Sequence, residues 1–144
     1  MREILFRGKR IQGGDWVEGY FFKSDINKRA RESGKATLIF TPHCDTFITV
    51  PECHNSFMVV SDTVGQYTGL KDKNGKRIFE GDILRSCYDN LYPDDGSIEV
   101  VKWLLNGWHI QQGEYPPDAM DGDGVMPYSE VIGNIHDNPE LLKK

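Results

Sequence analysis

Short runs of apolar and β-branched residues recur along the chain, and pairs of turn-forming residues separate them. Asn-Gly and Gly-Gly pairs supply the positive φ angles that a tight hairpin turn requires. Three such pairs stand next to β-forming runs: Gly13-Gly14 between residues 3–9 and 15–22, Asn74-Gly75 before residues 77–85, and Asn106-Gly107 between residues 97–104 and 108–112. The pattern predicts a β-hairpin at each place.

Further short runs have the composition of buried strands, because they are rich in β-branched and aromatic residues and are bounded by Pro, Gly or Asn. They are residues 36–40, 46–50 and 57–60. Helix is favoured only over residues 24–33 and in a last turn, where Asn138 can cap and Pro139 can take the first helical position. Residues 88–97 and 113–124 have little apolar content, so we expect loops there. The predicted fold class is mainly β with little helix.

The size and composition of the chain indicate one domain. Its 144 residues, 38% of them hydrophobic, can bury a core without crosslinks. Three cysteines, an odd number, argue against a disulfide framework. The sequence contains no apolar run long enough for a signal segment or a membrane span. We therefore expect a single domain over residues 1–144 of a cytoplasmic protein with no membrane contact.

A long phrase in the middle of the chain carries a resemblance to a known family. Residues 63–84, Thr-Val-Gly-Gln-Tyr-Thr-Gly-Leu-Lys-Asp-Lys-Asn-Gly-Lys-Arg-Ile-Phe-Glu-Gly-Asp-Ile-Leu, resemble the YopX family of small proteins found in phages and prophages. Residues 2–9 with 16–20, and residues 130–142, resemble the two ends of that family in the right order. The resemblance implies a YopX-like, largely β fold and a phage or prophage host setting. It implies no activity and brings no site residues.

The same phrase predicts the structural centre of the protein, since bend residues and β-formers alternate densely within it. We expect five of its residues to be buried: Tyr67, Leu70, Ile78, Ile83 and Leu84. A strand entered through Gly81-Asp82, followed by a hairpin with Trp103 and Trp108 across its turn, resembles a small SH3-like barrel. We therefore expect an N-terminal β lobe at roughly 1–60 and a barrel-like lobe at roughly 61–137.

Two pairs of metal-ligating residues stand close together in the sequence, His43-Cys44 and Cys53-His54. Two thiolates and two imidazoles could form a tetrahedral zinc site if a hairpin brought the pairs together. Adjacent residues of a strand point to opposite faces, however, and the spacing matches no common zinc motif. We expect ordinary residues at strand ends here, no metal and no cofactor.

Other candidates for chemistry are single residues or partial motifs. Asp121, Asp123, Gly124 and Glu130 match part of a calcium-binding loop, but its first acidic ligand is missing. Cys87, His109 and His136 could contribute to a hydrolase site, yet no nucleophile motif surrounds them. The chain also lacks a Gly-rich phosphate loop. We therefore expect no catalytic residues and a protein that is not an enzyme.

These observations favour a non-enzymatic binding or assembly module of a phage or prophage. Many short strands leave sheet edges to be paired, so we expect a homo-oligomer with its interface near Phe21, Phe22, Phe57 and Met58; an unknown protein partner is also possible. The alternative is a nucleic-acid-binding regulatory or accessory protein that uses basic residues, although the net charge of −5 disfavours phosphate. These basic residues are Arg2, Arg7, Lys9, Arg10, Lys28, Arg29 and Arg31.

Overall fold

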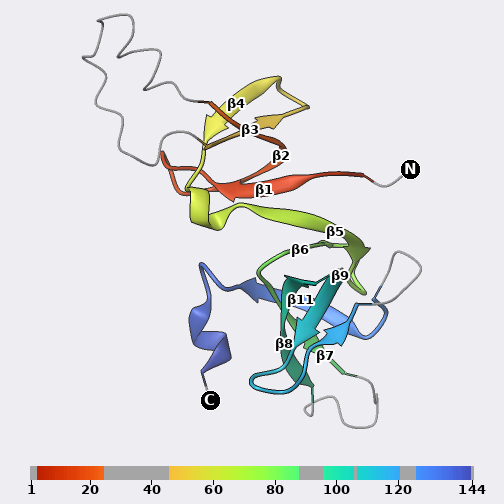
Figure 1. The fold of residues 1–144 in the computed structure, drawn as a ribbon. Coiled ribbons are helices and arrows are strands. Elements are labelled where there is room, and N and C mark those ends of the chain that lie inside the picture. Colours follow the sequence, from red (N-terminus) through yellow and green to blue (C-terminus); the bar gives the residue numbers. More distant parts are fainter. Residues whose placement is uncertain (1–2, 25–45, 88–95, 106, 121–125, 144) are drawn as a thin grey trace, which may run out of the picture. The chain divides into compact units, whose positions relative to one another are not determined.

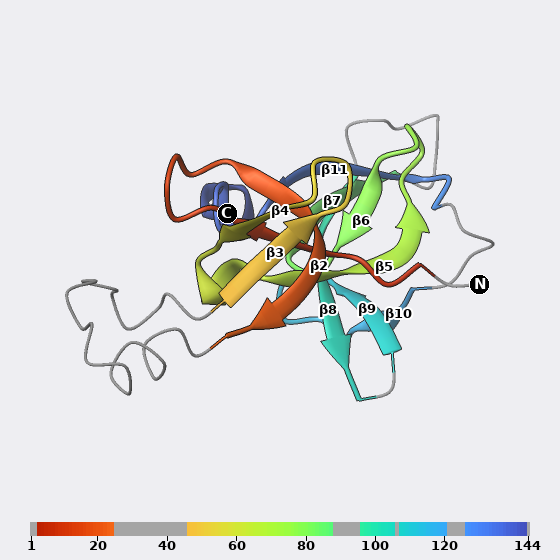
Figure 2. The same cartoon turned by 90° about the horizontal axis from the view of Figure 1, so that it is seen from above.

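Antiparallel β-strands dominate the computed structural model, which describes residues 3–24, 46–87, 96–105, 107–120 and 126–143 (Figures 1 and 2). Helical residues within these ranges are confined to two short 3₁₀ turns, η1 (Ser61–Thr63) and η3 (Pro139–Leu142). The mainly β prediction is confirmed. The chain divides into two compact units: an N-terminal unit, Ile4–Gln66, and a C-terminal unit formed by Met1–Glu3 with Tyr67–Lys144.

The N-terminal unit is built from consecutive antiparallel hairpins. Its strands are β1 (Phe6–Lys9), β2 (Trp16–Lys23), β3 (Thr46–Val50) and β4 (Asn55–Met58), and the first two residues of β5 (Gly65–Lys71) pair with β1. The predicted hairpin between β1 and β2 is confirmed, with positive φ at Gly13 and Gly14. The predicted strand at 46–50 is also confirmed, whereas 36–40 and the helix predicted after Ser24 lie outside the described residues.

The core of the N-terminal unit is small and apolar. Ile48 and Val59 are fully buried, and a side chain at Gly8 would press against both. Gly19 permits an even closer approach, since a Cβ there would overlap the backbone carbonyl of Thr49. Glycine at these two positions therefore permits a close approach that any other residue would prevent.

The C-terminal unit holds an open five-stranded antiparallel sheet in the order β10-β9-β8-β7-β11. The strands of this sheet are β7 (Asp82–Ser86), β8 (Ser97–Leu104), β9 (Gly107–Gln111), β10 (Asp118–Ala119) and β11 (Ser129–Asn134). The unit also contains the remainder of β5, which pairs with β6 (Arg77–Phe79). The pairing Leu104↔Gly107 confirms the β8–β9 hairpin, but Gly107 begins β9 and the positive φ, +51°, is at Leu105. The turn at Asn74-Gly75 is confirmed too, because Gly75 has φ +81° and donates its N–H to the carbonyl of Asp72 at 3.0 Å.

Two predictions made from the sequence do not match the C-terminal unit. The SH3-like barrel is not confirmed, because a barrel closes by pairing its first and last strands, and β10 and β11 stay at opposite edges of the described sheet. β10 also lies inside the predicted loop at 113–124. Its two residues pair with His109 and Ile110, so backbone pairing rather than apolar content makes this strand.

The core of the C-terminal unit contains most of the residues expected from the central phrase. Tyr67, Ile78, Ile83 and Leu84 are buried, while Leu70 is only partly buried against the cluster. The cluster itself consists of Ile78, Leu84, Val101, Trp108, Ile110 and Met126. In the described parts of the chain, no helix has the length and hydrophobicity needed to span a membrane.

Candidate functional site

Aromatic side chains reach the surface on one face of the N-terminal sheet. Cross-strand pairing places Tyr20 beside Thr49, and Phe22 and Met58 beside Phe47. Phe22 stacks on Phe47 with ring centroids 5.2 Å apart. Phe47 is 8% exposed, whereas Phe22 is 40% and Tyr20 60% exposed. We call these five residues the aromatic patch; none of them is charged.

The four residues expected at an interface do not lie on one face of the sheet. Phe22 and Met58 belong to the aromatic patch, but Phe21 and Phe57 pair with Ile48 and therefore face the opposite side. Successive residues of a strand alternate between faces. Neighbours in the sequence such as Phe21 and Phe22 thus cannot line one flat surface, and the exposed Tyr20 takes the place of Phe21.

A second surface feature lies on the outer face of β8 in the C-terminal unit. A groove of about 1010 Å³, open to solvent, runs between the turn at 112–115 and η3. We call it the β8 groove. Its lining includes Ile98, Val100, Lys102, Tyr115, Leu141 and Leu142. Tyr115 is 66% exposed, so an aromatic ring is available at its rim.

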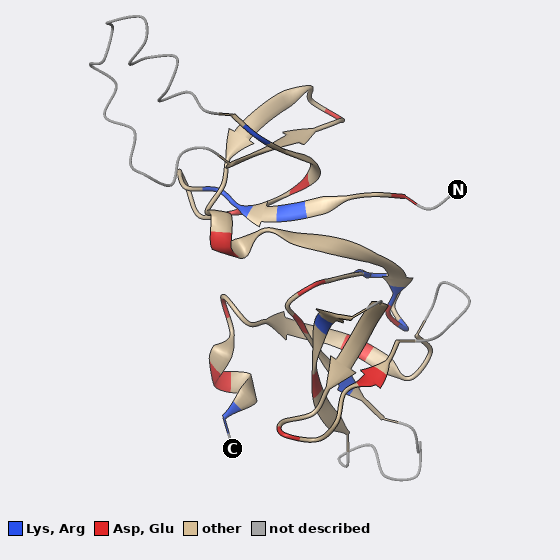
Figure 3. Cartoon of the chain, viewed as in Figure 1, with Lys and Arg blue, Asp and Glu red and all other residues tan. Residues whose placement is uncertain are grey.

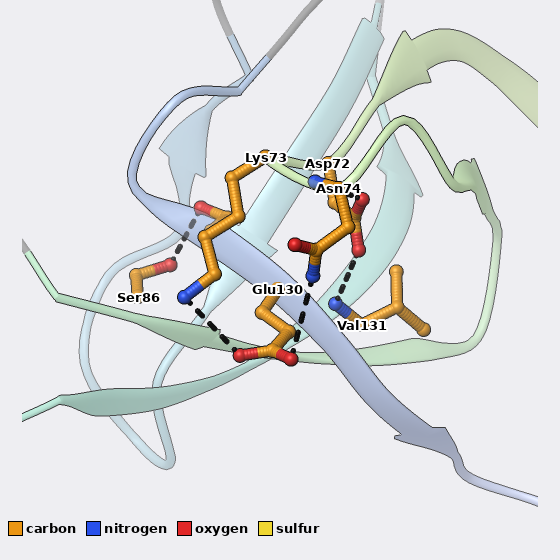
Figure 4. A network of polar contacts seen from close by, with 7 residues as sticks. Asp72, Lys73, Asn74, Ser86, Glu130 and Val131 are labelled. Carbon is orange, nitrogen blue, oxygen red and sulfur yellow. Dashed lines mark hydrogen bonds and ion pairs between the residues drawn. The ribbon is translucent and has the colours of Figure 1, made fainter.

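The outer edge of β11 is covered by the turn that joins β5 to β6 (Figure 4). Asp72 is buried, and its Oδ1 accepts the backbone N–H groups of Asn74 and Lys76, both at 2.9 Å. Its Oδ2 accepts the N–H of Val131 at 3.0 Å. Lys73 donates its own N–H to the carbonyl of Ser129 at 3.0 Å. The turn thus satisfies an edge that would otherwise offer donors and acceptors to another chain.

Charged side chains reinforce the same junction. Glu130 forms an ion pair with Lys73 at 3.2 Å and accepts a hydrogen bond from the side-chain amide of Asn74 at 3.4 Å (Figure 4). Glu130 is the last residue of the partial calcium motif, and Asp121, Asp123 and Gly124 lie outside the described residues. Its described partners are a cation and an amide donor, which is a structural arrangement.

A buried polar cluster lies beside this junction. The Ser86 hydroxyl donates to Glu99 Oε2 at 2.8 Å, and the Ser97 hydroxyl donates to Oε1 at 3.0 Å. Ser86 Oγ also lies 2.8 Å from Ser129 Oγ. Because Ser86 has a single hydroxyl proton, Ser129 must be the donor in that contact. The carboxylate and hydroxyls are therefore engaged with one another, as buried polar groups require.

The structure places the remaining candidates apart. Cys53 and His54 occupy the turn between β3 and β4 rather than a strand end, while His43 and Cys44 lie outside the described residues. His109 is on β9, with Nδ1 2.9 Å from the carbonyl of Gly107. His136 lies in the turn after β11, and its backbone N–H donates to Oδ1 of Asn134. Cys87 follows β7, and its backbone N–H donates to the carbonyl of Tyr128 at 2.9 Å. In the described ranges, no three potential metal-ligating residues gather.

Two basic residues of the N-terminal unit, Arg7 and Arg10, contact aromatic rings of the same unit. The guanidinium of Arg7 is 4.9 Å from the ring centre of Trp16, and Arg7 is only 8% exposed. Arg10 lies 4.4 Å above the ring of Phe57 and pairs with Asp15 at 3.3 Å. Acidic and basic residues are interspersed over the described strands rather than separated (Figure 3). Arg2, Lys28, Arg29 and Arg31 lie outside the described residues.

Sequence reasoning missed the polar junction, although one signal was present. Asp72 begins an Asp-Lys-Asn-Gly run, and Asp at the start of a turn accepts backbone N–H groups two or more residues later. The bond from Asp72 to β11, by contrast, joins residues 59 positions apart. No local pattern predicts such a contact.

With the fold and these surfaces described, comparison with known proteins identifies the class. The model of the YopX protein family matches residues 5–143, so the chain belongs to that family and the resemblance of the central phrase is confirmed. The fold is also similar to the crystal structure of protein EF1440 from Enterococcus faecalis, with 24% identity, a TM-score of 0.51, and coverage of 99% of this chain and 100% of that one. No curated protein matches the sequence.

Proposed function

We propose that this YopX protein is a non-enzymatic, cytoplasmic binding and assembly module of a phage or prophage, and that it self-associates through the aromatic patch. The observation that carries the proposal is the exposure of Tyr20 and Phe22 above the buried ring of Phe47. Contiguous exposed apolar surface marks interaction sites in soluble proteins. The engagement of the Asp72, Glu99 and Glu130 carboxylates in structural contacts supports the non-enzymatic assignment.

The sheet faces, rather than the sheet edges, suit this role. The edge of β11 is covered by Asp72 and Lys73, and the end of β4 is bridged by Arg10↔Val59. A two-fold dimer brings a patch against its own copy. Because the five residues of the aromatic patch are uncharged, they set no like charges against their copies in a self-docked pair, and a second copy is a suitable occupant.

Nucleic-acid binding through the N-terminal basic residues is the weaker alternative. Arg7 is buried, and Arg10 forms an ion pair with Asp15. Neither guanidinium is therefore as accessible to a phosphate as an arginine on the open surface would be. We therefore do not propose it, and a salt-dependent gel shift with single-stranded DNA would reverse that choice.

Sedimentation of the full chain at micromolar concentration tests the proposal. We expect a dimer of the 16.4 kDa chain, and a monomer for Tyr20→Glu, which places two carboxylates in the self-docked patch. The control is Tyr128→Glu, since Tyr128 is 51% exposed in the other unit and outside the patch. A monomeric parent chain, or a dimer that survives Tyr20→Glu, would overturn the assembly role of the patch.

A further inference from the structure

The β8 groove has an apolar floor that follows the pleat of a strand. Ile98, Val100 and Lys102 line it, while Glu99 and Val101 between them are buried on the core side. Leu141 and Leu142, from the 3₁₀ turn η3, form part of its wall and are 37% and 42% exposed. Apolar surface thus remains accessible on both sides of the groove.

The charge of the groove differs from the charge of the chain. Lys102 and Lys143 line it together with a single acidic residue, Glu114, while the whole chain carries −5. The Nζ of Lys102 donates to Gln111 Oε1 at 2.8 Å in an exposed contact. An ammonium has three protons, so this cation keeps the capacity to bind a carboxylate.

The shape of the groove favours an extended chain over a compact ligand. The lining residues along β8 and at the residue before it run from Gly96 to Lys102, which at about 3.3 Å per residue corresponds to roughly 20 Å. Small-molecule sites usually enclose most of the ligand surface. A groove that is partly open to water leaves an acyl chain partly exposed, whereas a peptide backbone can form hydrogen bonds with that water.

We propose that the β8 groove binds an extended polypeptide segment of about six residues, with apolar side chains at alternate positions and a carboxylate at one end. Alternate side chains of the segment lie on Ile98 and Val100 and against Leu141 and Leu142. The carboxylate pairs with Lys102 and Lys143. This site lies wholly within the C-terminal unit and does not depend on the aromatic patch.

Fluorescence anisotropy with labelled hexapeptides tests the proposal on the full chain. The probes are Leu-Thr-Val-Thr-Leu-Asp and the same peptide with Lys in place of Asp, both titrated to about 1 mM protein. We expect saturable binding of the acidic peptide and at least a roughly 5-fold weaker affinity for the basic one, the effect of about 1 kcal/mol from a surface ion pair. Raised salt should reduce that difference.

Matched variants locate the binding. Lys102→Glu should weaken the acidic peptide by at least about 5-fold and strengthen the basic one. Leu142→Ser should weaken the binding of both peptides. Lys76 is an exposed lysine outside the groove, so Lys76→Glu should leave the affinity for both peptides unchanged. Circular dichroism confirms that each variant is folded. The proposal is overturned if neither peptide shows saturable binding, or if Lys102→Glu leaves the affinity for the acidic peptide unchanged. It is also overturned if sodium dodecanoate binds in a way that Leu142→Ser weakens while neither peptide binds.

Discussion

The two units bury different chemistry. In the N-terminal unit, Ile48 and Val59 pack around Gly8, and the described polar residues that are buried, Arg7, Thr46 and Thr63, include no carboxylate. In the C-terminal unit, buried carboxylates and hydroxyls lie beside the apolar cluster, among them Asp72, Glu99, Ser86 and Ser129. The difference shows two ways of fixing a small antiparallel sheet.

An apolar core stabilises in proportion to the area it removes from water but has no directional preference. A polar cluster contributes little net free energy per bond, yet it penalises every arrangement in which a donor or acceptor is lost. We infer that apolar burial provides stability in both units. In the C-terminal unit, the polar contacts additionally hold the β5–β6 turn on β11.

The largest expected effect comes from truncating the apolar core in each unit. Ile48→Ala and Ile83→Ala should each lower the free energy of unfolding by about 2–5 kcal/mol, because both side chains are fully buried and alanine leaves a cavity. Chemical denaturation measures the change. The control Ile11→Ala, at a side chain that is 41% exposed, should change stability by less than about 0.5 kcal/mol. A loss that small for Ile83→Ala would show that the core is misplaced.

The next effect concerns the contact that distinguishes the C-terminal unit. Asp72→Ala removes the acceptor of three backbone N–H groups and should cost about 2–4 kcal/mol, since bonds to a charged group contribute roughly 1.5–3 kcal/mol each and are not additive.

Asp72→Asn separates the two parts of this role. The amide oxygen can keep the bonds to Asn74 and Lys76, while the amide nitrogen cannot accept from Val131. Hydrogen exchange should therefore accelerate at the Val131 N–H and stay slow at the Lys76 N–H. Equal acceleration at both would mean that the turn and the strand edge open together.

Features that depend on neighbouring residues could be predicted from the sequence, and features that depend on distant residues could not. The hairpin at Gly13-Gly14 and the burial of Ile78, Ile83 and Leu84 were predictable because turn chemistry and apolar patterns are local. The β8–β9 hairpin was also predictable, but not its turn, since Gly107 belongs to β9 and the positive φ is at Leu105. Whether the strands close into a barrel was not predictable, since closure depends on which distant strands pair. Buried Glu99 was also missed, because a carboxylate within a strand reads as surface until its serine partners are known.

The candidate surfaces were harder to predict than the fold. Phe22 and Met58 were named beforehand, but their shared face depends on the register of β2, β3 and β4, which the sequence does not state. The β8 groove combines β8 with Leu141 and Leu142, about forty residues later in the chain. Such a surface exists only once the fold is formed.

A smaller effect is expected from the buried carboxylate of the polar cluster. Glu99→Gln keeps the size of the side chain but replaces one acceptor oxygen by an amide donor, and the serine hydroxyls can rotate to accept from it. We expect a loss of about 1 kcal/mol by urea denaturation. The exposed Glu52→Gln serves as control and should be neutral. A stabilised Glu99→Gln protein would show that burying the carboxylate is a net cost to the fold.

The smallest effect should emerge only at high pH. Burial raises the pKa of the Tyr67 phenol above its ordinary value; Arg77 opposes this shift and Glu3 adds to it. A group whose pKa is higher in the folded than in the unfolded chain favours folding below the unfolded pKa, which is about 10 for tyrosine. That contribution is lost as the pH rises through the folded pKa, because the unfolded chain then releases the proton more readily.

Comparison of Tyr67→Phe with the parent chain isolates this contribution from the other five tyrosines and the lysines. Between about pH 9 and pH 11, the urea midpoint of the parent should fall more steeply than that of Tyr67→Phe. The control Tyr115→Phe, at a ring that is 66% exposed, should follow the parent. Parallel curves for the parent and Tyr67→Phe would mean that the phenol reaches solvent. Tyr67 would then belong to the surface of the C-terminal unit rather than to the packing with Phe79, whose ring centre lies 5.5 Å away.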